Sequence, residues 1–113
     1  DQGITERAVT AEAHSDGRRL AAARAALDAH DWALARTLAT EVLSTPASID
    51  AAQDARAIRA RANIAAGNVD SARDDLEAYR SRVVRDDDPF LREANALLTQ
   101  LREAPAKPMG ERR

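Results

Sequence analysis

The sequence predicts an all-α protein, on the grounds of its composition, an internal repeat and a series of helix-boundary signals. Its 113 residues include 27 alanines and 16 arginines, but one tryptophan, one tyrosine and one phenylalanine. Alanine and arginine favour helices, whereas the β-branched and aromatic residues that favour strands are scarce. A chain of this length forms a single domain with a modest core. Helix faces lined by alanine also let neighbouring helix axes approach closely.

An internal repeat emerges when the chain is shifted by 37 residues, which places residues 24–36 on residues 61–73. The identical pairs are Arg24/Arg61, Ala25/Ala62, Ala29/Ala66, Ala35/Ala72 and Arg36/Arg73. Leu27/Ile64 and Trp32/Val69 keep their apolar character, and a tight turn precedes both Trp32 and Val69. The repeat therefore predicts two antiparallel helix–turn–helix units.

Boundary signals predict about five helices in this frame. Ser15 or Asp16 caps a first helix that runs to about residue 29, and Asp31 caps a second. Pro46 ends that second helix, because a proline cannot continue the ladder of backbone hydrogen bonds. The third helix starts between residues 46 and 50 and ends at Gly67.

A fourth helix is expected from about residue 69 to 84. A fifth begins with Asp88 as its cap and Pro89 at its first position. The predicted domain spans residues 16–103, with a first repeat at about 16–46, a second at about 47–84 and a capping helix at about 89–103. Residues 1–15 form a short helix or extend the first one, and residues 104–113 are expected to be a disordered tail.

This arrangement resembles the tetratricopeptide repeat, a pair of antiparallel helices of about 34 residues. The turn and the start of each second helix carry the resemblance: His30-Asp31-Trp32 with Ala35, and Gly67-Asn68-Val69 with Ala72. Ala23 and Ala60 match the small residue of the family's first helix, and Pro46 approximates its closing proline. The resemblance covers residues 17–84 and implies a right-handed solenoid fragment, with the fifth helix as a cap.

The first helix of each unit departs from the family pattern. Arg19 and Arg56 stand where the family has a large aromatic residue, and Ala22 and Arg59 stand where it has leucine. The repeat length of 37 and the histidine at the first turn are also unusual. An ordinary helical bundle with coincident turns is therefore the alternative fold.

No residue pattern in the chain predicts catalysis, a cofactor or a metal. Glycine-rich phosphate loops and nucleophile elbows are absent, and there is no cysteine. His30 is expected to be structural at a helix C-terminus, with a metal or general-base role as the alternative. The run Asp86-Asp87-Asp88 suits helix capping better than calcium binding. We expect Trp32 to pack between helices, and a partner anchor is the alternative.

The family resemblance implies a groove along the inner faces of the first helices, where peptides bind. The residues that fall on this face are Leu20, Arg24, Leu27, Arg61 and Ile64. Arginine forks suit carboxylates, so we expect a protein or peptide partner with acidic groups. Alternatively, these arginines only solvate their helices and pair with Asp28 and Asp54.

The distribution of charged and apolar residues bears on two other classes of partner, nucleic acids and membranes. The net charge of −2 arises from interspersed acids and bases, so we expect no nucleic-acid partner, and no apolar run is long enough for a membrane span. The start at Asp1 rather than Met favours a processed, exported form over a cytoplasmic one, but leaves the compartment open.

The expected function is a non-catalytic protein–protein interaction module, a scaffold or adaptor. The alternative is a structural accessory subunit of a larger, envelope-associated bacterial assembly, because the arginine-rich, lysine-poor composition is typical of GC-rich bacterial genomes. A ligand-sensing or enzymatic domain would need a concave pocket with converging polar groups, for which the sequence offers no pattern.

Overall fold

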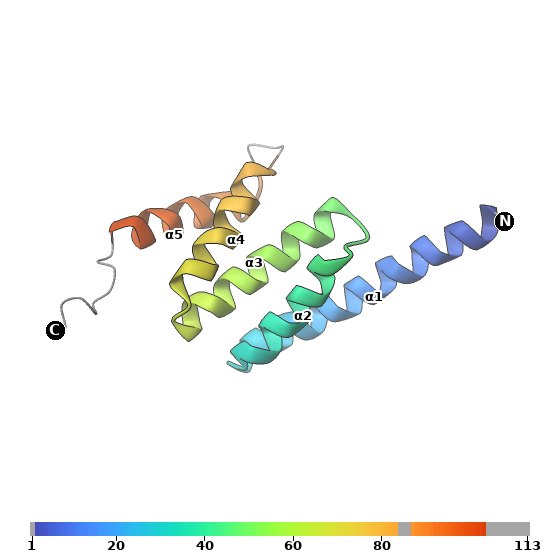
Figure 1. The fold of residues 1–113 in the computed structure, drawn as a ribbon, viewed down its shortest axis with the longest axis horizontal. Helices are drawn as coiled ribbons and strands as arrows, with labels where there is room; N and C mark the ends of the chain where they lie inside the picture. Colours follow the sequence, from blue (N-terminus) through green and yellow to red (C-terminus); the bar gives the residue numbers. More distant parts are fainter. Residues whose placement is uncertain (1, 84–86, 104–113) are drawn as a thin grey trace.

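The computed structural model describes residues 2–83 and 87–103 of the chain. Over these residues the protein consists of five α-helices without a strand, which confirms the predicted all-α fold (Figure 1). The helices are α1 (Gln2–Asp28), α2 (Trp32–Ser44), α3 (Ile49–Ala66), α4 (Val69–Ser81) and α5 (Leu91–Glu103). The predicted tail at residues 104–113 lies outside the described residues.

Helix α1 runs unbroken through Gly17, so residues 2–15 extend the first helix rather than form a separate one. Glycine weakens a helix interior by only about 1 kcal/mol, and neighbouring favourable residues override that cost. Figure 1 shows the N-terminal half of α1 projecting past α2, with no other described helix beside it.

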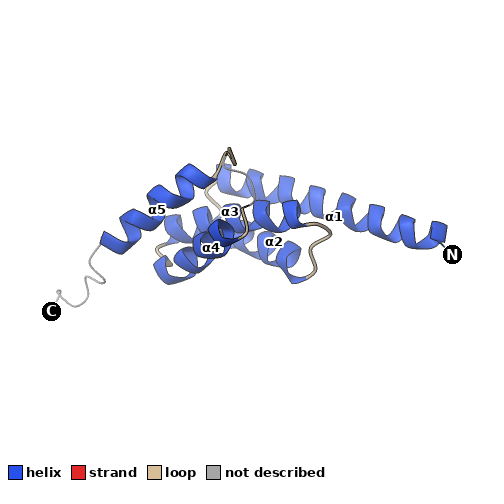
Figure 2. Ribbon diagram, turned by 90° about the horizontal axis from the view of Figure 1, so that it is seen from above, coloured by secondary structure: helices blue, strands red, loops and turns tan. Residues whose placement is uncertain are grey.

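The helices form two layers, with α1, α3 and α5 in one and α2 and α4 in the other (Figure 2). Each helix packs against the next one along the chain, and α1 also packs against α3. The backbones of α3 and α5 stay farther apart than those of α1 and α3. The described chain is thus a helical-repeat-like stack in which most contacts join neighbours in the sequence.

The turns within the two helix pairs share a left-handed residue. Gly67 has a φ of 87° and closes α3, while His30 has a φ of 62° in the corresponding turn after α1. Histidine adopts this conformation at some cost, and its ring stacks on Trp32 with centroids 5.1 Å apart. Asp31 caps α2 as predicted, because its carboxylate accepts the Leu34 N–H at 3.2 Å.

The connections between the pairs also follow the capping signals, with shifted ends. Ser48 caps α3 by accepting the Ala51 N–H at 3.0 Å. Helix α4 ends at Ser81, before the predicted residue 84, and α5 starts at Leu91 rather than Pro89. This start is later because the Leu91 N–H bonds to the Asp88 carbonyl, three residues back, as in a tighter turn.

Two apolar cores lie along the stack. The first core joins α1, α2 and α3, and its buried residues are Leu20, Ala23, Ala26, Ala35, Ala39, Val42, Ala51, Ala55, Ile58 and Ala62. The second core joins α3, α4 and α5, and its buried residues are Ala57, Ala60, Leu76, Tyr79, Phe90, Ala94 and Leu98. Helix α3 therefore contributes to both.

Burial follows the 37-residue repeat. The buried pairs at this spacing include Leu20/Ala57, Ala23/Ala60, Ala35/Ala72, Ala39/Leu76 and Val42/Tyr79. The same shift carries Ala57 of α3 onto the buried Ala94 of α5. The internal repeat read from the sequence is therefore also present in the packing, and α5 packs as the first helix of each pair does.

Candidate functional site

The two repeat-equivalent arginines each reach to the next helix of their own layer. Arg24 on α1 contacts Asp54 on α3 with its Nη2 3.4 Å from Oδ2. Arg61 on α3 donates two hydrogen bonds to Glu93 on α5, at 2.8 and 3.1 Å. The expected alternative, in which an arginine pairs with Asp54, is thus realised for Arg24. Arg61 has a partner that sequence reasoning did not foresee.

The carboxylates of these two pairs have opposite pKa shifts. Burial raises the pKa of Asp54; Arg24 counteracts this, and the charges of Asp50 and Asp88 raise the pKa further. The hydrogen bond from Arg61 lowers the pKa of Glu93. The Arg61 guanidinium also lies 4.6 Å from the centre of the Phe90 ring, a cation–π distance.

The apolar members of the predicted groove belong to the cores. Leu20 is only 5% exposed in the first core, and Leu27 packs against that core. Ile64 packs against the second core instead. The structure therefore does not bring Leu20 and Leu27 together with Ile64. Of the five predicted partner-binding residues, Arg24 and Arg61 alone are exposed.

The opposite side of α3 faces a hollow of about 380 Å³ between α2 and α4. Its lining residues are Arg36, Thr40, Arg59, Asn63, Ser71, Asp74 and Asp75. Arg59 is committed to Asp75 by two hydrogen bonds of 2.7 and 2.9 Å, and it also donates to Thr40 at 3.1 Å. The hydrogen bonds to Asp75 raise the pKa of Arg59.

A second hollow, of about 390 Å³, lies at the start of α3. Its lining residues are Pro46, Ser48, Ile49, Ala52, Arg56 and Arg82. Ala52, Arg56, Arg59 and Asn63 recur at helical spacing, so the two hollows follow one face of α3. We call this combined surface the α3 trough. It carries four arginines against two aspartates, and its apolar side chains lie at the Ile49 end.

Ile49 is the most exposed large apolar side chain among the described residues, with 74% of its surface open to solvent. On its other side lies a hollow of about 450 Å³, whose polar lining includes Asp50, Asp54 and Asp88. Ile49 and Arg82 line both this acidic hollow and the trough. They separate two surfaces of opposite charge.

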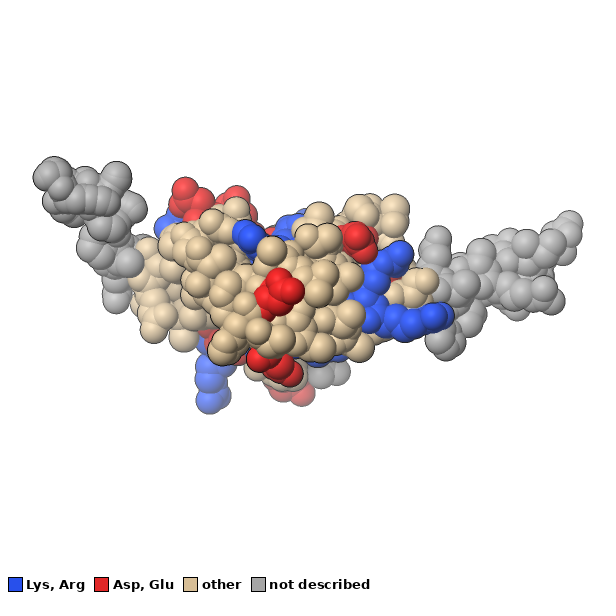
Figure 3. Space-filling model, turned by 90° about the horizontal axis from the view of Figure 1, so that it is seen from below, with Lys and Arg blue, Asp and Glu red and all other residues tan. Residues whose placement is uncertain are grey.

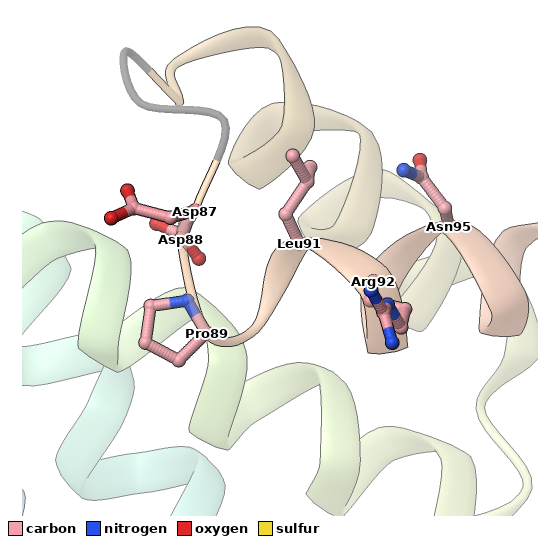
Figure 4. A pocket seen from close by; sticks show the side chains of 6 residues that line it. All are labelled: Asp87, Asp88, Pro89, Leu91, Arg92 and Asn95. Atoms are coloured by element: carbon pink, nitrogen blue, oxygen red, sulfur yellow. The ribbon is translucent and has the colours of Figure 1, made fainter.

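The connection between α4 and α5 forms a further open hollow of about 610 Å³ (Figure 4). In this view the labelled side chains come from the connection and from the start of α5, with acidic, basic and apolar groups mixed. Asp88 accepts the Tyr79 hydroxyl at 2.6 Å and the Phe90 N–H at 2.9 Å. Asp88 thus holds the turn that precedes α5, but this helix starts at Leu91 and not directly after Asp88 as predicted. Asp86 lies outside the described residues.

The part of the chain that the structure describes offers no further candidate site for a metal ion or for a membrane. No three His, Cys, Asp or Glu side chains among these residues are arranged to hold a metal ion. None of the described helices combines the length and apolar character that crossing a bilayer requires. Figure 3 shows a mostly uncharged surface on the side of the α1–α2 and α3–α4 turns, with acidic and basic groups interspersed.

Comparison with family models, curated proteins and solved structures returns no match to this chain. The resemblance to tetratricopeptide repeats consequently stays a prediction from the residues quoted above. The candidate site has to be judged from its own geometry.

Sequence reasoning named neither Ile49 nor Arg82 as a candidate, whereas it placed Arg56 at the rim of the predicted inner groove. One signal was present in the sequence: Ile49 directly follows a helix cap, where no core contact is needed. Arg56 and Arg82 come together only through the packing of α3 against the end of α4.

Proposed function

We propose that this chain is a non-catalytic protein–protein interaction module that docks a partner chain on the surface around Ile49. The observation that supports it is a large apolar side chain, 74% exposed, with an open hollow on each side. Single exposed apolar residues are common, but here Pro46, Val83 and Pro89 extend the apolar surface around Ile49. Apolar surface of this kind, rimmed by charge, is typical of docking sites.

The energetic basis is the removal of this surface from water. Complete burial of an isoleucine side chain contributes about 1.5–3 kcal/mol. Arginines at the rim add directional hydrogen bonds and select the partner. No bond is made or broken in such a function, and the helical stack acts as a rigid support.

The test is partner capture with wild-type protein, with Ile49→Ser and with Leu34→Ser. Leu34 is also a large exposed apolar residue, at 45% exposure, but it lines none of the hollows described around Ile49. A captured protein is then purified and mixed with each variant, and the complex is followed by analytical ultracentrifugation. We expect Ile49→Ser to weaken the complex and Leu34→Ser to leave it unchanged, with equal helicity by circular dichroism.

Two results would contradict the proposal: no protein forms a stoichiometric complex, or Ile49→Ser and Leu34→Ser behave alike. A partner that never dissociates under native conditions would identify the module as an accessory subunit of a permanent assembly. The predicted inner groove is tested in the same experiment with Arg24→Gln combined with Arg61→Gln.

A further inference from the structure

Two arginines at the Ile49 end of the α3 trough, Arg56 and Arg82, have no carboxylate partner among the described residues. Five of the chain's other arginines form ion pairs there, namely Arg19, Arg24, Arg59, Arg61 and Arg73. Arg56 donates to the Gln53 side chain at 2.8 Å, and Arg82 donates to the Ala78 carbonyl and the Ser81 hydroxyl, both at 3.2 Å. All of these acceptors are uncharged.

Both side chains are accessible to a ligand, because Arg82 is exposed and Arg56 is only partly buried. Partial burial, and then the charge of the neighbouring Arg82, lower the pKa of Arg56. The two positive charges therefore lie close enough to repel each other, and an anion between them would relieve that repulsion.

The apolar end of the trough lies beside these charges. Pro46, Ile49 and Ala52 share the 390 Å³ hollow with Arg56 and Arg82. A ligand that fills it has to present an apolar group to the first set and an anionic group to the second. Free phosphate offers only the anion, whereas a peptide segment offers both from adjacent side chains.

On these grounds we propose that the α3 trough binds an acidic–apolar peptide segment of a protein partner. An Ile or Leu of the segment packs on Pro46, Ile49 and Ala52, and a neighbouring Asp or Glu accepts hydrogen bonds from Arg56 and Arg82. This inference rests on the proposed interaction function and names the chemistry of the partner. It also places the acidic ligand on the side of α3 opposite to the Arg24 and Arg61 pairs.

The charge distribution supports this side of α3. The two arginines of the predicted inner groove already face Asp54 and Glu93, and Asp50 and Asp88 lie close to Asp54. An acidic segment would meet four carboxylates there. In the trough it meets four arginines and two aspartates, one of which is neutralised by Arg59.

The direct test uses short fluorescein-labelled peptides and fluorescence polarisation. The probe peptide has glutamates flanking leucine and isoleucine; matched peptides carry glutamine or lysine for glutamate, or serine for the apolar residues. We expect the probe to bind at least about tenfold more tightly than each matched peptide, because each of these loses either the charge-assisted bonds or the apolar burial. Binding should weaken as salt rises.

Matched protein variants locate the site. Arg56→Gln with Arg82→Gln should lower the affinity for the probe by about tenfold or more, since glutamine keeps most of the aliphatic stem but removes the charge. Ile49→Ser should weaken it through the apolar end alone. Arg24→Gln with Arg61→Gln should leave it unchanged. Thermal unfolding and circular dichroism confirm that each variant is folded.

Three outcomes would overturn the inference. The affinity for the probe is unchanged by the substitutions of Arg56 and Arg82, the serine-substituted peptide binds as tightly as the probe, or single-stranded oligothymidylate binds more tightly than the probe. The same variants are applied to the natural partner once it is captured. If that partner binds but ignores Arg56 and Arg82, the trough assignment fails and the interaction function stands. If no partner forms a complex, the interaction function itself fails.

Discussion

The first and second cores hold their helices together in different ways. Alanine provides seven of the ten buried residues in the first core, and α1 and α3 approach each other there. It provides three of seven in the second core, where Tyr79 and Phe90 meet edge to face at 4.9 Å. The backbones of α3 and α5 are farther apart, and Phe90 with Arg61 occupies the intervening space. Side-chain size thus sets the helix spacing in each half.

Polar contacts reinforce this difference. The second half contains the Arg59–Asp75 pair, the Tyr79–Asp88 hydrogen bond and the bond from Gln53 to the Tyr79 carbonyl at 3.0 Å. In the first half, the buried Asp16 accepts the Ala47 N–H at 2.8 Å. Asp16 and Gln53 occupy equivalent positions of the repeat, and each bonds the backbone near the end of the second helix of its own pair. The repeat thus keeps a side-chain to backbone hydrogen bond at this position, but the carboxylate of Asp16 accepts it and the amide of Gln53 donates it.

The largest expected effect is a cavity in the second core. Leu76 is fully buried, so Leu76→Ala should lower the free energy of unfolding by about 3 kcal/mol. Urea denaturation followed by circular dichroism measures this loss. Leu34→Ala on the exposed surface is the control and should change stability by less than about 0.5 kcal/mol. Equal losses for both variants would mean that Leu76 does not anchor the second core.

The first core should instead be sensitive to added volume. Ala39 is fully buried where α2 packs on its neighbours, so Ala39→Leu should destabilise the protein by about 2 kcal/mol. Ala33→Leu places the same side chain on the exposed face of α2, where we expect a change of less than about 0.5 kcal/mol. If Ala39→Leu is as stable as the wild type, the close packing inferred for this half is wrong.

Of the two repeat-equivalent arginines, the one in the second half should contribute more to stability than the one in the first. Arg61→Gln removes two hydrogen bonds and a cation–π contact, which we expect to cost about 1 kcal/mol. Arg24→Gln removes one long, exposed contact and should cost less than about 0.5 kcal/mol. Urea titration of both variants measures the gap, and a larger loss for Arg24→Gln would reverse the comparison.

The smallest expected effect is the pH dependence of these pairs. The pKa of Glu93 is lowered in the folded state, so its contribution to stability is present above its unfolded pKa and lost as pH falls through the folded one. The pKa of Asp54 is raised, so its contribution is present below its unfolded pKa and lost as pH rises through the folded one.

Both carboxylates are partly exposed, so we expect the contribution of each to the free energy of unfolding to change by less than about 0.5 kcal/mol with pH. Urea unfolding at mildly acidic and at neutral pH gives the free energy of unfolding of Glu93→Gln and of Asp54→Asn relative to the wild type. These two differences should change with pH in opposite directions. A change in the same direction would contradict the assigned pKa shifts.

Local signals were sufficient to predict most of the fold. Asp31 and Gly67 act on their own backbone neighbours, so the helix ends that they mark follow from sequence alone. The connection between α4 and α5 was predicted less well, because the tighter turn at Asp88 delays the start of α5.

The candidate site depended on tertiary placement. The repeat alignment placed Leu20 on an inner face, yet alignment does not show whether a neighbouring helix covers that face, and α2 and α3 do. The partner of Arg61 could not be predicted, because Glu93 lies 32 residues away on a helix whose position depends on Phe90. Arg56 and Arg82 likewise meet only in the folded chain.

The stacking of His30 on Trp32 has a consequence for spectroscopy. Trp32 is the sole tryptophan of the chain, and it packs against the first core. Its fluorescence therefore reports on the first half, in the surroundings that the stacked imidazole helps to form. Tyr79 and Phe90 supply the near-ultraviolet signal of the second half. The molecule thus carries a separate optical probe in each half, and unfolding of the two halves can be timed in one sample without any label.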